Sequence, residues 1–436
     1  MPSDDLEWRA QLRARLLRMS SSQPQTATRY EPPSRSANPP LESLVQGEWV
    51  TTAEGRYFLS EQVYPLDHRH GELCLGAWNQ LSGEQWSPFV LDPEGQGFEP
   101  RNALFFDLET TGLGRGTGTY AFLVGVGFFV DNGFVARQYF MPSYADEKAL
   151  LQALARDLAE HPALVSFNGR TFDWPILQTR YIVSRCPLPQ QGDLHLDLLP
   201  LARRLWRRTL DSCALSSLET SVLGVRRNGS DVPGFLIPTL YQEYIREGRT
   251  RPIARIFYHN VIDLLSMVTL AAKAGQVLQT TLDPQESLPC DYLSLAILYE
   301  HMDRVEDALR AYQLANERPT SPEEAETAYK RQTLLLKRLG RYDEAAEIWR
   351  KQMNRRDIFP YVELAKYLEH RLRDYAAAEQ VVQEAVCWLQ QPNRSLREAE
   401  RRHLLAELQH RLSRVQRRLQ NAPECIGQED ANTASP

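Results

Sequence analysis

The spacing of hydrophobic and polar positions divides the chain into two regions of different character. Before about residue 170, short apolar runs are broken by glycine, proline and asparagine. After about residue 288, apolar residues recur at three- to four-residue spacing instead. Short apolar runs bounded by turn residues are typical of strands, and the longer period is typical of helices. The spacing therefore predicts a sheet-containing region followed by an all-helical region.

The clearest strand pattern lies between residues 103 and 141. Three apolar runs predict three strands, at 103–106, 122–130 and 134–141. Asn132-Gly133 separates the last two runs, and Asn-Gly between apolar runs marks a tight antiparallel hairpin. The segments that follow alternate between helix and strand: a helix near 146–160, a strand at 163–167 and a helix from Thr171. This order of elements predicts a ribonuclease H-like mixed α/β sheet over residues 101–275.

Three further segments precede this sheet. Leucines at helical spacing predict an amphipathic helix over residues 1–19. Residues 20–45 are rich in proline and serine and predict a disordered linker, because they have little apolar surface to offset the entropy of ordering. Short strand-like runs separated by glycine and proline predict a small β-rich lead-in over residues 46–100.

Two histidines of the lead-in deserve a separate interpretation. His68 and His70 stand two positions apart, which puts them on one face of a strand. Two histidines on one face can hold a metal ion. No third ligand stands nearby in the sequence, so we favour a polar pair on the surface.

The helical region contains a repeated pattern. Three segments align with one another: 304–308, 341–345 and 374–378. The alanines that end them, Ala308, Ala345 and Ala378, are 37 and 33 residues apart, and small residues recur where helices must approach closely. This period resembles tetratricopeptide repeats. The resemblance implies an all-α repeat domain over residues 288–420 that binds a protein partner, followed by a flexible tail at 421–436.

The composition is that of a folded, soluble protein. The 436 residues are 42% hydrophobic and 24% charged, which is ordinary globular composition and enough for several domains. We find no uninterrupted apolar run near the ~18 residues that a membrane-spanning helix needs. Six cysteines lie far apart without C-x-x-C spacing, which excludes a disulfide framework and a zinc site of that type. We therefore expect a cytoplasmic protein that contacts no membrane.

The charge distribution leaves room for a local contact with nucleic acid. The net charge of −6 excludes a protein that coats nucleic acid by bulk positive charge. Residues 200–260 nevertheless contain ten arginines against five acidic residues. Four of these arginines stand within two helical turns: Arg203, Arg204, Arg207 and Arg208. They form either a phosphate-binding groove or a solvated helix face, and the sequence favours neither interpretation.

Carboxylates follow the predicted strands of the α/β region. Asp107 and Glu109 come directly after the apolar run 104–106, and residues two apart on a strand project from one face. Asp173 stands in the first turn of the helix that follows the strand at 163–167. Taken singly, these residues fit an ordinary polar strand end and a partner for the helix dipole.

A third acidic cluster opens a later apolar helix. His259 and Asp263 stand four positions apart and therefore share one helix face. A capping aspartate beside a polar histidine is the ordinary interpretation. Three acidic clusters at strand ends or helix starts of one α/β unit are improbable as coincidence, however, and they predict one shared site.

The residues around these carboxylates resemble known motifs. Asp-Leu-Glu-Thr-Thr-Gly from Asp107, Asn-Gly-Arg-Thr-Phe-Asp ending at Asp173, and the final histidine-aspartate pair resemble the three motifs of DEDD-type 3′→5′ exonucleases. Residues 49 to about 275 resemble the bacterial YprB-like ribonuclease H-like family. The likeness includes two further segments, His-Leu-Asp-Leu at 195–198 and Ala-Arg-Arg-Leu-Trp at 202–206.

The resemblance implies a site for two divalent cations, Mg²⁺ or Mn²⁺. Four carboxylates would hold them: Asp107, Glu109, Asp173 and Asp263. Hard cations take oxygen ligands, and such a pair activates a water molecule on one side and stabilises the leaving oxygen on the other. Asp197 is expected beside these ligands as a supporting carboxylate.

The motifs leave the proton acceptor open. His259 is our candidate because imidazole titrates near neutral pH and because it shares a helix face with Asp263. One exonuclease subclass has histidine five positions before the last aspartate, and another has tyrosine four before it. This chain instead has Tyr258 at five and His259 at four. The choice between Tyr258 and His259 therefore stays open.

Four residues are predicted to contact the substrate. Thr110, Asn168 and Phe172 belong to the motifs, and the resemblance implies that they face the nucleic acid. Phe172 is equally compatible with a place in the core. Arg180 stands seven positions after Asp173, on the same helix face, and is predicted to contact a phosphate.

Together these features predict a metal-dependent nuclease. We expect a 3′→5′ exonuclease that acts on single-stranded DNA or RNA by two-metal-ion hydrolysis. Two alternatives stay open. One is a non-catalytic scaffold that binds nucleic acid and recruits a partner through the repeats, and the other is a structure-specific endonuclease on the same fold.

Overall fold

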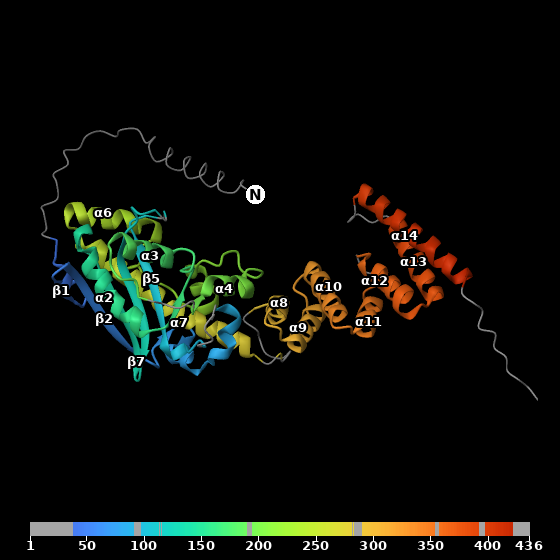
Figure 1. The fold of residues 1–436 in the computed structure, drawn as a ribbon, viewed down its shortest axis with the longest axis horizontal. Helices are drawn as coiled ribbons and strands as arrows, with labels where there is room; N and C mark the ends of the chain where they lie inside the picture. Colours follow the sequence, from blue (N-terminus) through green and yellow to red (C-terminus); the bar gives the residue numbers. More distant parts are fainter. Residues whose placement is uncertain are drawn as a thin grey trace, which may run out of the picture.

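The structure is a computed structural model of the whole chain. It describes residues 38–90, 97–112, 114, 116–189, 194–280, 282, 290–353, 357–391 and 397–421. The predicted N-terminal helix, most of the predicted linker and nearly all of the predicted tail lie outside these residues. Figure 1 shows two parts: a sheet flanked by helices, and a row of helices that extends away from it.

A seven-stranded mixed sheet forms the centre of the first part. Its order is β1-β2-β7-β6-β5-β8-β9. The strands are β1 (Glu48–Thr52), β2 (Gly55–Pro65), β5 (Ala103–Thr110), β6 (Ala121–Val130), β7 (Gly133–Phe140), β8 (Ala163–Ser166) and β9 (His195–Asp197). Strands β5, β6 and β7 are antiparallel neighbours, whereas β8 runs parallel to β5 and β9 runs parallel to β8. The predicted mixed sheet is confirmed.

The lead-in is not the separate unit that the sequence predicts. Strand β2 pairs with β7 from Phe58 opposite Phe140 to Pro65 opposite Gly133, so β1 and β2 extend the main sheet. An unpaired β7 would leave an open sheet edge, and this pairing covers it. The first residues of the structure are also ordered, since Leu41 is buried and the Thr250 hydroxyl donates to the Pro39 carbonyl. The predicted disorder is therefore wrong for residues 38–45.

The rest of the lead-in has little strand. Two-residue strands β3 (Arg69–His70) and β4 (Leu73–Cys74) form a small second sheet, and two 3₁₀ segments follow, Leu75–Gln80 and Gly83–Phe89. His70 points inward, where its Nε2 lies 2.8 Å from the Ser266 hydroxyl, whereas the His68 ring packs on Tyr64. The two histidines therefore form neither a metal pair nor a surface pair.

Helices cover both faces of the sheet. They are α2 (Glu147–Glu160), α3 (Asp173–Val183), α4 (Leu198–Trp206), α5 (Leu215–Leu218), α6 (Ile237–Glu247) and α7 (Thr250–Gln279). Side chains of β5 alternate between two hydrophobic cores, with Phe105 in one and Leu104, Phe106 and Leu108 in the other. A strand buried on both faces reads as a continuous apolar run, as β5 does.

Helix α7 is the longest helix of this part and contacts β5, β6 and β7. By length and composition alone it could cross a membrane. However, 72% of its most apolar window is buried inside the protein, as in the core helix of a globular domain.

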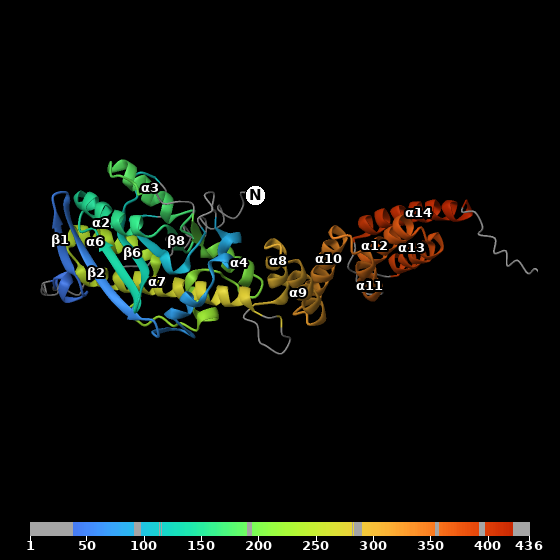
Figure 2. The same cartoon turned by 60° about the horizontal axis from the view of Figure 1, so that its bottom comes forward.

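The second part is all-helical, as predicted. Its helices are α8 (Tyr292–His301), α9 (Val305–Glu317), α10 (Pro322–Arg338), α11 (Tyr342–Gln352), α12 (Phe359–Tyr367), α13 (Tyr375–Gln390) and α14 (Glu398–Gln420), with a π-helical turn at Leu368–Leu372. Consecutive helices pack on one another along the row (Figure 2). The aligned alanines Ala308, Ala345 and Ala378 are fully buried in α9, α11 and α13. The repeat in the sequence therefore marks the second helix of each pair.

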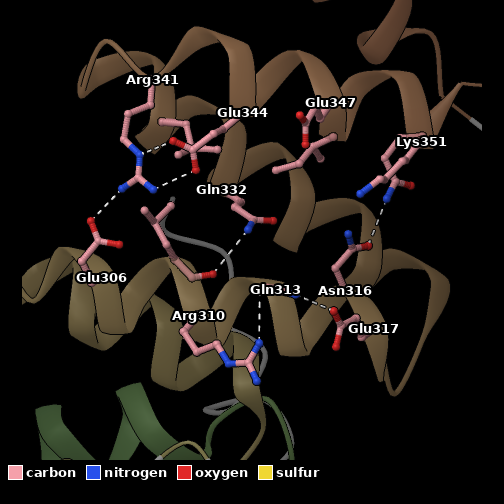
Figure 3. A pocket seen from close by; sticks show the side chains of 14 residues that line it. Glu306, Arg310, Gln313, Asn316, Glu317, Gln332, Arg341, Glu344, Glu347 and Lys351 are labelled. Atoms are coloured by element: carbon pink, nitrogen blue, oxygen red, sulfur yellow. Dashed lines mark hydrogen bonds and ion pairs between the residues drawn. The ribbon is translucent and has the colours of Figure 1, made fainter.

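A polar cavity of about 640 Å³ lies between α9, α10 and α11. Figure 3 shows Arg341 reaching across it to Glu306 of α9 and pairing with Glu344, three residues further along the chain, with a distance of 2.6 Å between the guanidinium and each carboxylate. Gln332 donates to the Leu309 carbonyl at its centre. Three of its charged side chains, Arg341, Glu306 and Glu344, thus form ion pairs with one another.

Candidate active site

Three of the predicted carboxylates meet at one cavity. Asp107 comes from β5, Asp173 begins α3, and Asp263 lies on α7. All three line a cavity of about 690 Å³, together with Asn168 and Phe172. Glu109 is buried two positions beyond Asp107 on the same strand. Asp107 and Asp263 are 156 positions apart in the sequence, so the fold brings them together.

The carboxylates oppose one another's ionisation. Burial, with the charges of Asp263 and Asp173, raises the pKa of Asp107 well above its usual range. Burial and the charge of Asp107 do the same to the pKa of Glu109. Burial and the charges of neighbouring carboxylates raise the pKa of Asp173 to about 7. Burial likewise raises the pKa of Asp263.

Among the described residues, Arg227 forms an ion pair with Asp263, whereas Asp107, Glu109 and Asp173 form none. In the described ranges, Glu109 Oε1 is buried and accepts no hydrogen bond. Within the same ranges, no three His, Cys, Asp or Glu side chains already stand as a group that could hold a metal ion. The donor set nevertheless suits hard divalent cations, because these take carboxylate oxygens and relieve the repulsion between them.

Asn260 on α7 holds Asp107 in place. Its Nδ2 donates to Asp107 Oδ2 at 2.8 Å, and its Oδ1 accepts from Gln138 Nε2 at 2.8 Å. Asn260 is fully buried against Gly125 of β6, where an added Cβ would lie only 2.1 Å from Asn260 Oδ1. The glycine therefore makes room for the amide that orients the carboxylate.

His259 and Asp263 share a face, as their spacing predicts. His259 Nε2 lies 3.6 Å from Asp263 Oδ2, and Nδ1 lies 2.7 Å from Asp231 Oδ1. Arg227 Nη1 also lies 3.0 Å from Nδ1. In the tautomer whose Nδ1 donates to Asp231, Nε2 keeps a lone pair on the side of Asp263. Tyr258 instead points toward the loop before α6, where the Asn228 amide donates to its hydroxyl at 3.5 Å.

Asp197 supports the loop between β8 and α3. One of its oxygens accepts from the Asn168 amide at 2.7 Å and from the Leu199 amide at 3.1 Å. The other accepts from the Arg170 amide at 3.3 Å. Asn168 has a positive φ of 68°, which an asparagine tolerates better than most residues. Asp197 therefore fixes the turn that presents Asn168 and Asp173 to the cavity.

Comparison with known proteins now identifies the family. A Bacillus subtilis (strain 168) protein described as uncharacterized protein YprB is 31% identical over 347 residues, which span 76% of this chain and 81% of the relative. The chain belongs to the YprB family. Residues 104–274 also match a family model described as the RNase_H superfamily. With the mixed sheet, this confirms the predicted ribonuclease H-like fold.

The matched span of this YprB-family chain includes every predicted site residue. Two of the predicted substrate residues, Asn168 and Phe172, line the cavity. Thr110 is buried, and its hydroxyl donates to the Gly112 carbonyl at 2.8 Å, so it shapes the turn after β5.

Arg180 does not reach the cavity, which corrects the prediction of a phosphate contact. Its side chain is fully buried and pairs with both carboxylate oxygens of Glu147 on α2, at 2.5 and 2.6 Å. It also donates to the Thr117 carbonyl and stacks 3.8 Å from the Tyr120 ring centroid. Asp173 and Arg180 do lie on one face of α3, but the end of that face that carries Arg180 packs against α2. A guanidinium held in this way is not available to a substrate.

The sequence analysis gave no role to a buried network behind Asp263. Arg227 contacts Asp263, and it donates to both oxygens of Glu219 at 2.6 and 2.7 Å. The Ser266 hydroxyl donates to Glu219 at 2.6 Å and lies next to His70. In this YprB-family chain, therefore, a lead-in histidine connects through three residues, Ser266, Glu219 and Arg227, to the last carboxylate of the site.

Proposed function

We propose that this YprB-family chain is a metal-dependent 3′→5′ exonuclease that acts on single-stranded DNA or RNA. The ribonuclease H-like domain supports nuclease chemistry in general. One observation carries the finer proposal: four carboxylates with raised pKa values lie together, Glu109 and Asp173 buried and Asp107 and Asp263 half-buried, and three of them line one cavity. Placing like charges close together in a buried site is costly. Bound cations would offset this cost, so a cation-binding site explains why the four carboxylates lie together.

The residues present fit two divalent cations. Asp107, Glu109, Asp173 and Asp263 would hold them, and the unpaired Glu109 Oε1 is a free donor. When bound, such cations activate water and stabilise the charge that develops on the phosphate and the leaving oxygen. Asn260 keeps Asp107 oriented, and the amides around Asp197 keep Asp173 at the start of α3. The chain thus supplies a fixed set of oxygens.

His259 is our proposed proton acceptor. Its Nδ1 bonds to Asp231, which sets the ring orientation, and its Nε2 faces Asp263. A base at this point can take a proton from an attacking water molecule near the carboxylates. Tyr258 is directed to another loop, so the geometry favours His259.

The cavity favours an unpaired strand. Phe167 and Phe172 line it beside the carboxylates, and exposed bases stack on aromatic rings in this way. Bases within a duplex keep their faces against their neighbours and cannot use such rings. The helical repeats are proposed to bind a protein partner, for which their elongated surface offers the area (Figure 2).

The test is degradation of 5′-labelled single- and double-stranded DNA and RNA oligonucleotides with Mg²⁺ or Mn²⁺. We expect a ladder that shortens from the 3′ end on single strands, and no ladder with Asp173→Asn or with EDTA. Internal fragments without a ladder would point to the endonuclease. Intact oligonucleotides under all conditions, with a folded protein, would overturn the proposal in favour of a binding scaffold.

A further inference from the structure

The arginine cluster of α4 divides between two sides of the helix. Arg203 and Arg207 stand one helical turn apart, and both line the cavity that contains Asp107, Asp173 and Asp263. Residues four apart on a helix share a face, so their guanidinium groups extend over one stretch of the cavity wall.

The other two arginines of the cluster have structural partners. The Arg204 guanidinium lies 5.9 Å from the ring centroid of Phe89 in the lead-in. Arg208 Nε lies 3.4 Å from Asp291 Oδ1, and Asp291 caps the N-terminus of α8, the first helix of the repeats. These two therefore face the packing partners of α4 and not the cavity.

Arg203 and Arg207 are exposed and carry their charge into the cavity. Within the described residues, no carboxylate lies within ion-pair distance of either guanidinium, in contrast to Arg227 and Arg180 of the same domain. Asp211 also lines the cavity beyond Arg207, so the two arginines give their side a net charge of about +1, opposite the wall that carries Asp107, Asp173 and Asp263.

A nucleic-acid strand needs both walls. The carboxylates of the metal-free site repel its phosphates. The guanidinium groups of Arg203 and Arg207 on the opposite wall offset that repulsion. Arginine binds phosphate oxygens with two parallel hydrogen bonds, which suits a backbone held at a fixed distance from the reacting phosphate. Leu199, Leu210 and Leu215 line the space between and offer apolar contact to sugars and bases.

We propose that Arg203 and Arg207 bind the phosphodiester backbone of the single strand next to the phosphate that is cleaved. The inference rests on the proposed function for the nature of the ligand, and it adds the residues that hold the strand. Backbone contacts carry no base information, so the strand is bound without sequence preference. Neither of the two interpretations of the four arginines therefore applies to all of them. Arg203 and Arg207 form the groove, and Arg204 and Arg208 stabilise the fold.

Binding and not cleavage is the first readout. Fluorescence anisotropy of labelled oligo-dT and oligo-U is recorded with the full chain in EDTA over a series of salt concentrations. For single strands, each lost phosphate contact reduces the slope of log affinity against log salt by about 0.7. We expect the pair Arg203→Ala and Arg207→Ala to reduce the slope by about 1.4 and to weaken binding about tenfold or more at low salt.

The matched control is the pair Arg204→Ala and Arg208→Ala, which removes the same charge from the other side of the helix. It should keep the wild-type slope. The charge-conserving pair Arg203→Lys and Arg207→Lys should keep most of it. Equal losses in both alanine pairs, or no oligonucleotide binding by the wild-type chain, would overturn the inference.

The two proposals fail separately. If the binding difference is found but no protein cleaves with any metal, the arginine assignment stands and the nuclease proposal falls. If cleavage is found and both alanine pairs bind alike, the reverse holds. Where cleavage occurs, loss of Arg203 and Arg207 should raise KM more than it lowers kcat, because these contacts form before the reaction.

Discussion

Two buried glutamates, one in each part of the molecule, have pKa values that are shifted in opposite directions. Glu369 of the helical part is fully buried, and burial alone would raise its pKa. Hydrogen bonds from Arg414 and the charges of Arg414, His370 and Arg411 outweigh burial and lower that pKa. Glu109 of the sheet part is surrounded by carboxylates, and its pKa is raised.

The difference separates structural charge from functional charge. In the helical part a buried acid comes with its own arginines, so the folded chain neutralises it. In the sheet part the same residue type is left with an unpaired oxygen beside Asp107. Burial and acidity are common to both glutamates, and only the missing partner marks the site.

The largest effect of a single substitution is expected at Asp107. We expect Asp107→Asn to lower nuclease activity at least a hundredfold, because losing even a group that supports a metal ligand costs about 10- to 100-fold. The metal-free protein should lose no stability, since the substitution removes a buried charge. Rates of oligonucleotide shortening and urea unfolding measure the two effects. Glu48→Gln on the exposed edge strand β1 is the control and should change neither, and full activity in Asp107→Asn would contradict the site.

Added metal should act on one part only. A ligand at one hundred times its Kd stabilises the folded state by about 2.7 kcal/mol. We therefore expect Mn²⁺ to raise the Tm of the sheet part in the wild-type chain but not in a variant carrying Asp107→Asn and Asp173→Asn. The readout is independent of catalysis. An unchanged wild-type Tm at saturating Mn²⁺ would argue against a cation site.

The paired glutamate should behave in the opposite way. We expect Glu369→Gln to destabilise the helical part by about 2 kcal/mol, because it leaves Arg411 and Arg414 without their carboxylate, although partial exposure of Arg414 limits the loss. Urea unfolding followed by circular dichroism measures it. Glu344→Gln, an exposed partner of Arg341, should cost less than about 0.5 kcal/mol and is the control. Equal effects would remove the distinction.

His70 gives the smallest expected effect and a pH dependence. Burial, with the charges of His68 and Arg227, lowers the pKa of His70 to about 4. The folded state then binds a proton at His70 less readily than the unfolded chain does. The full free energy of unfolding is therefore present above about pH 6.5, and part of it is lost as the pH falls toward 4. Between these values, at about pH 5, we expect a loss of about 1–2 kcal/mol.

The variant His70→Gln removes the titrating group and keeps a polar atom near Ser266. Its stability should fall less than that of the wild-type chain between about pH 6.5 and 5, as measured by urea unfolding at each pH. His68→Gln should keep most of the wild-type profile, because burial is the largest cause of the low His70 pKa and the charge of His68 is a smaller one. A wild-type profile in His70→Gln would show that the acid loss arises elsewhere.

Local sequence patterns were sufficient to predict the helices and strands and the types of residue that form the site. The Asn-Gly hairpin between β6 and β7, the strand before Asp107 and the shared face of His259 and Asp263 all depend on residues close in sequence. Each can be predicted because period and turn chemistry act over a few residues.

The errors concern contacts between distant segments. Helical spacing puts Arg180 on the face of Asp173 but does not say that α2 covers the end of that face with Glu147. Likewise, the short strand-like run in β2 predicts a strand but not its pairing with β7. The role of Asn260 was not predicted either, and an amide within the apolar run of a helix was the signal that could have found it.

Gly125 illustrates how far such dependence reaches. It is a glycine in the middle of β6 that contributes no functional group, and a methyl group added there would displace Asn260 from Asp107. A random-mutagenesis screen for inactive variants should therefore recover substitutions at Gly125 among those of the carboxylates. The tolerance of this strand to mutation is set by a hydrogen bond on the helix beside it.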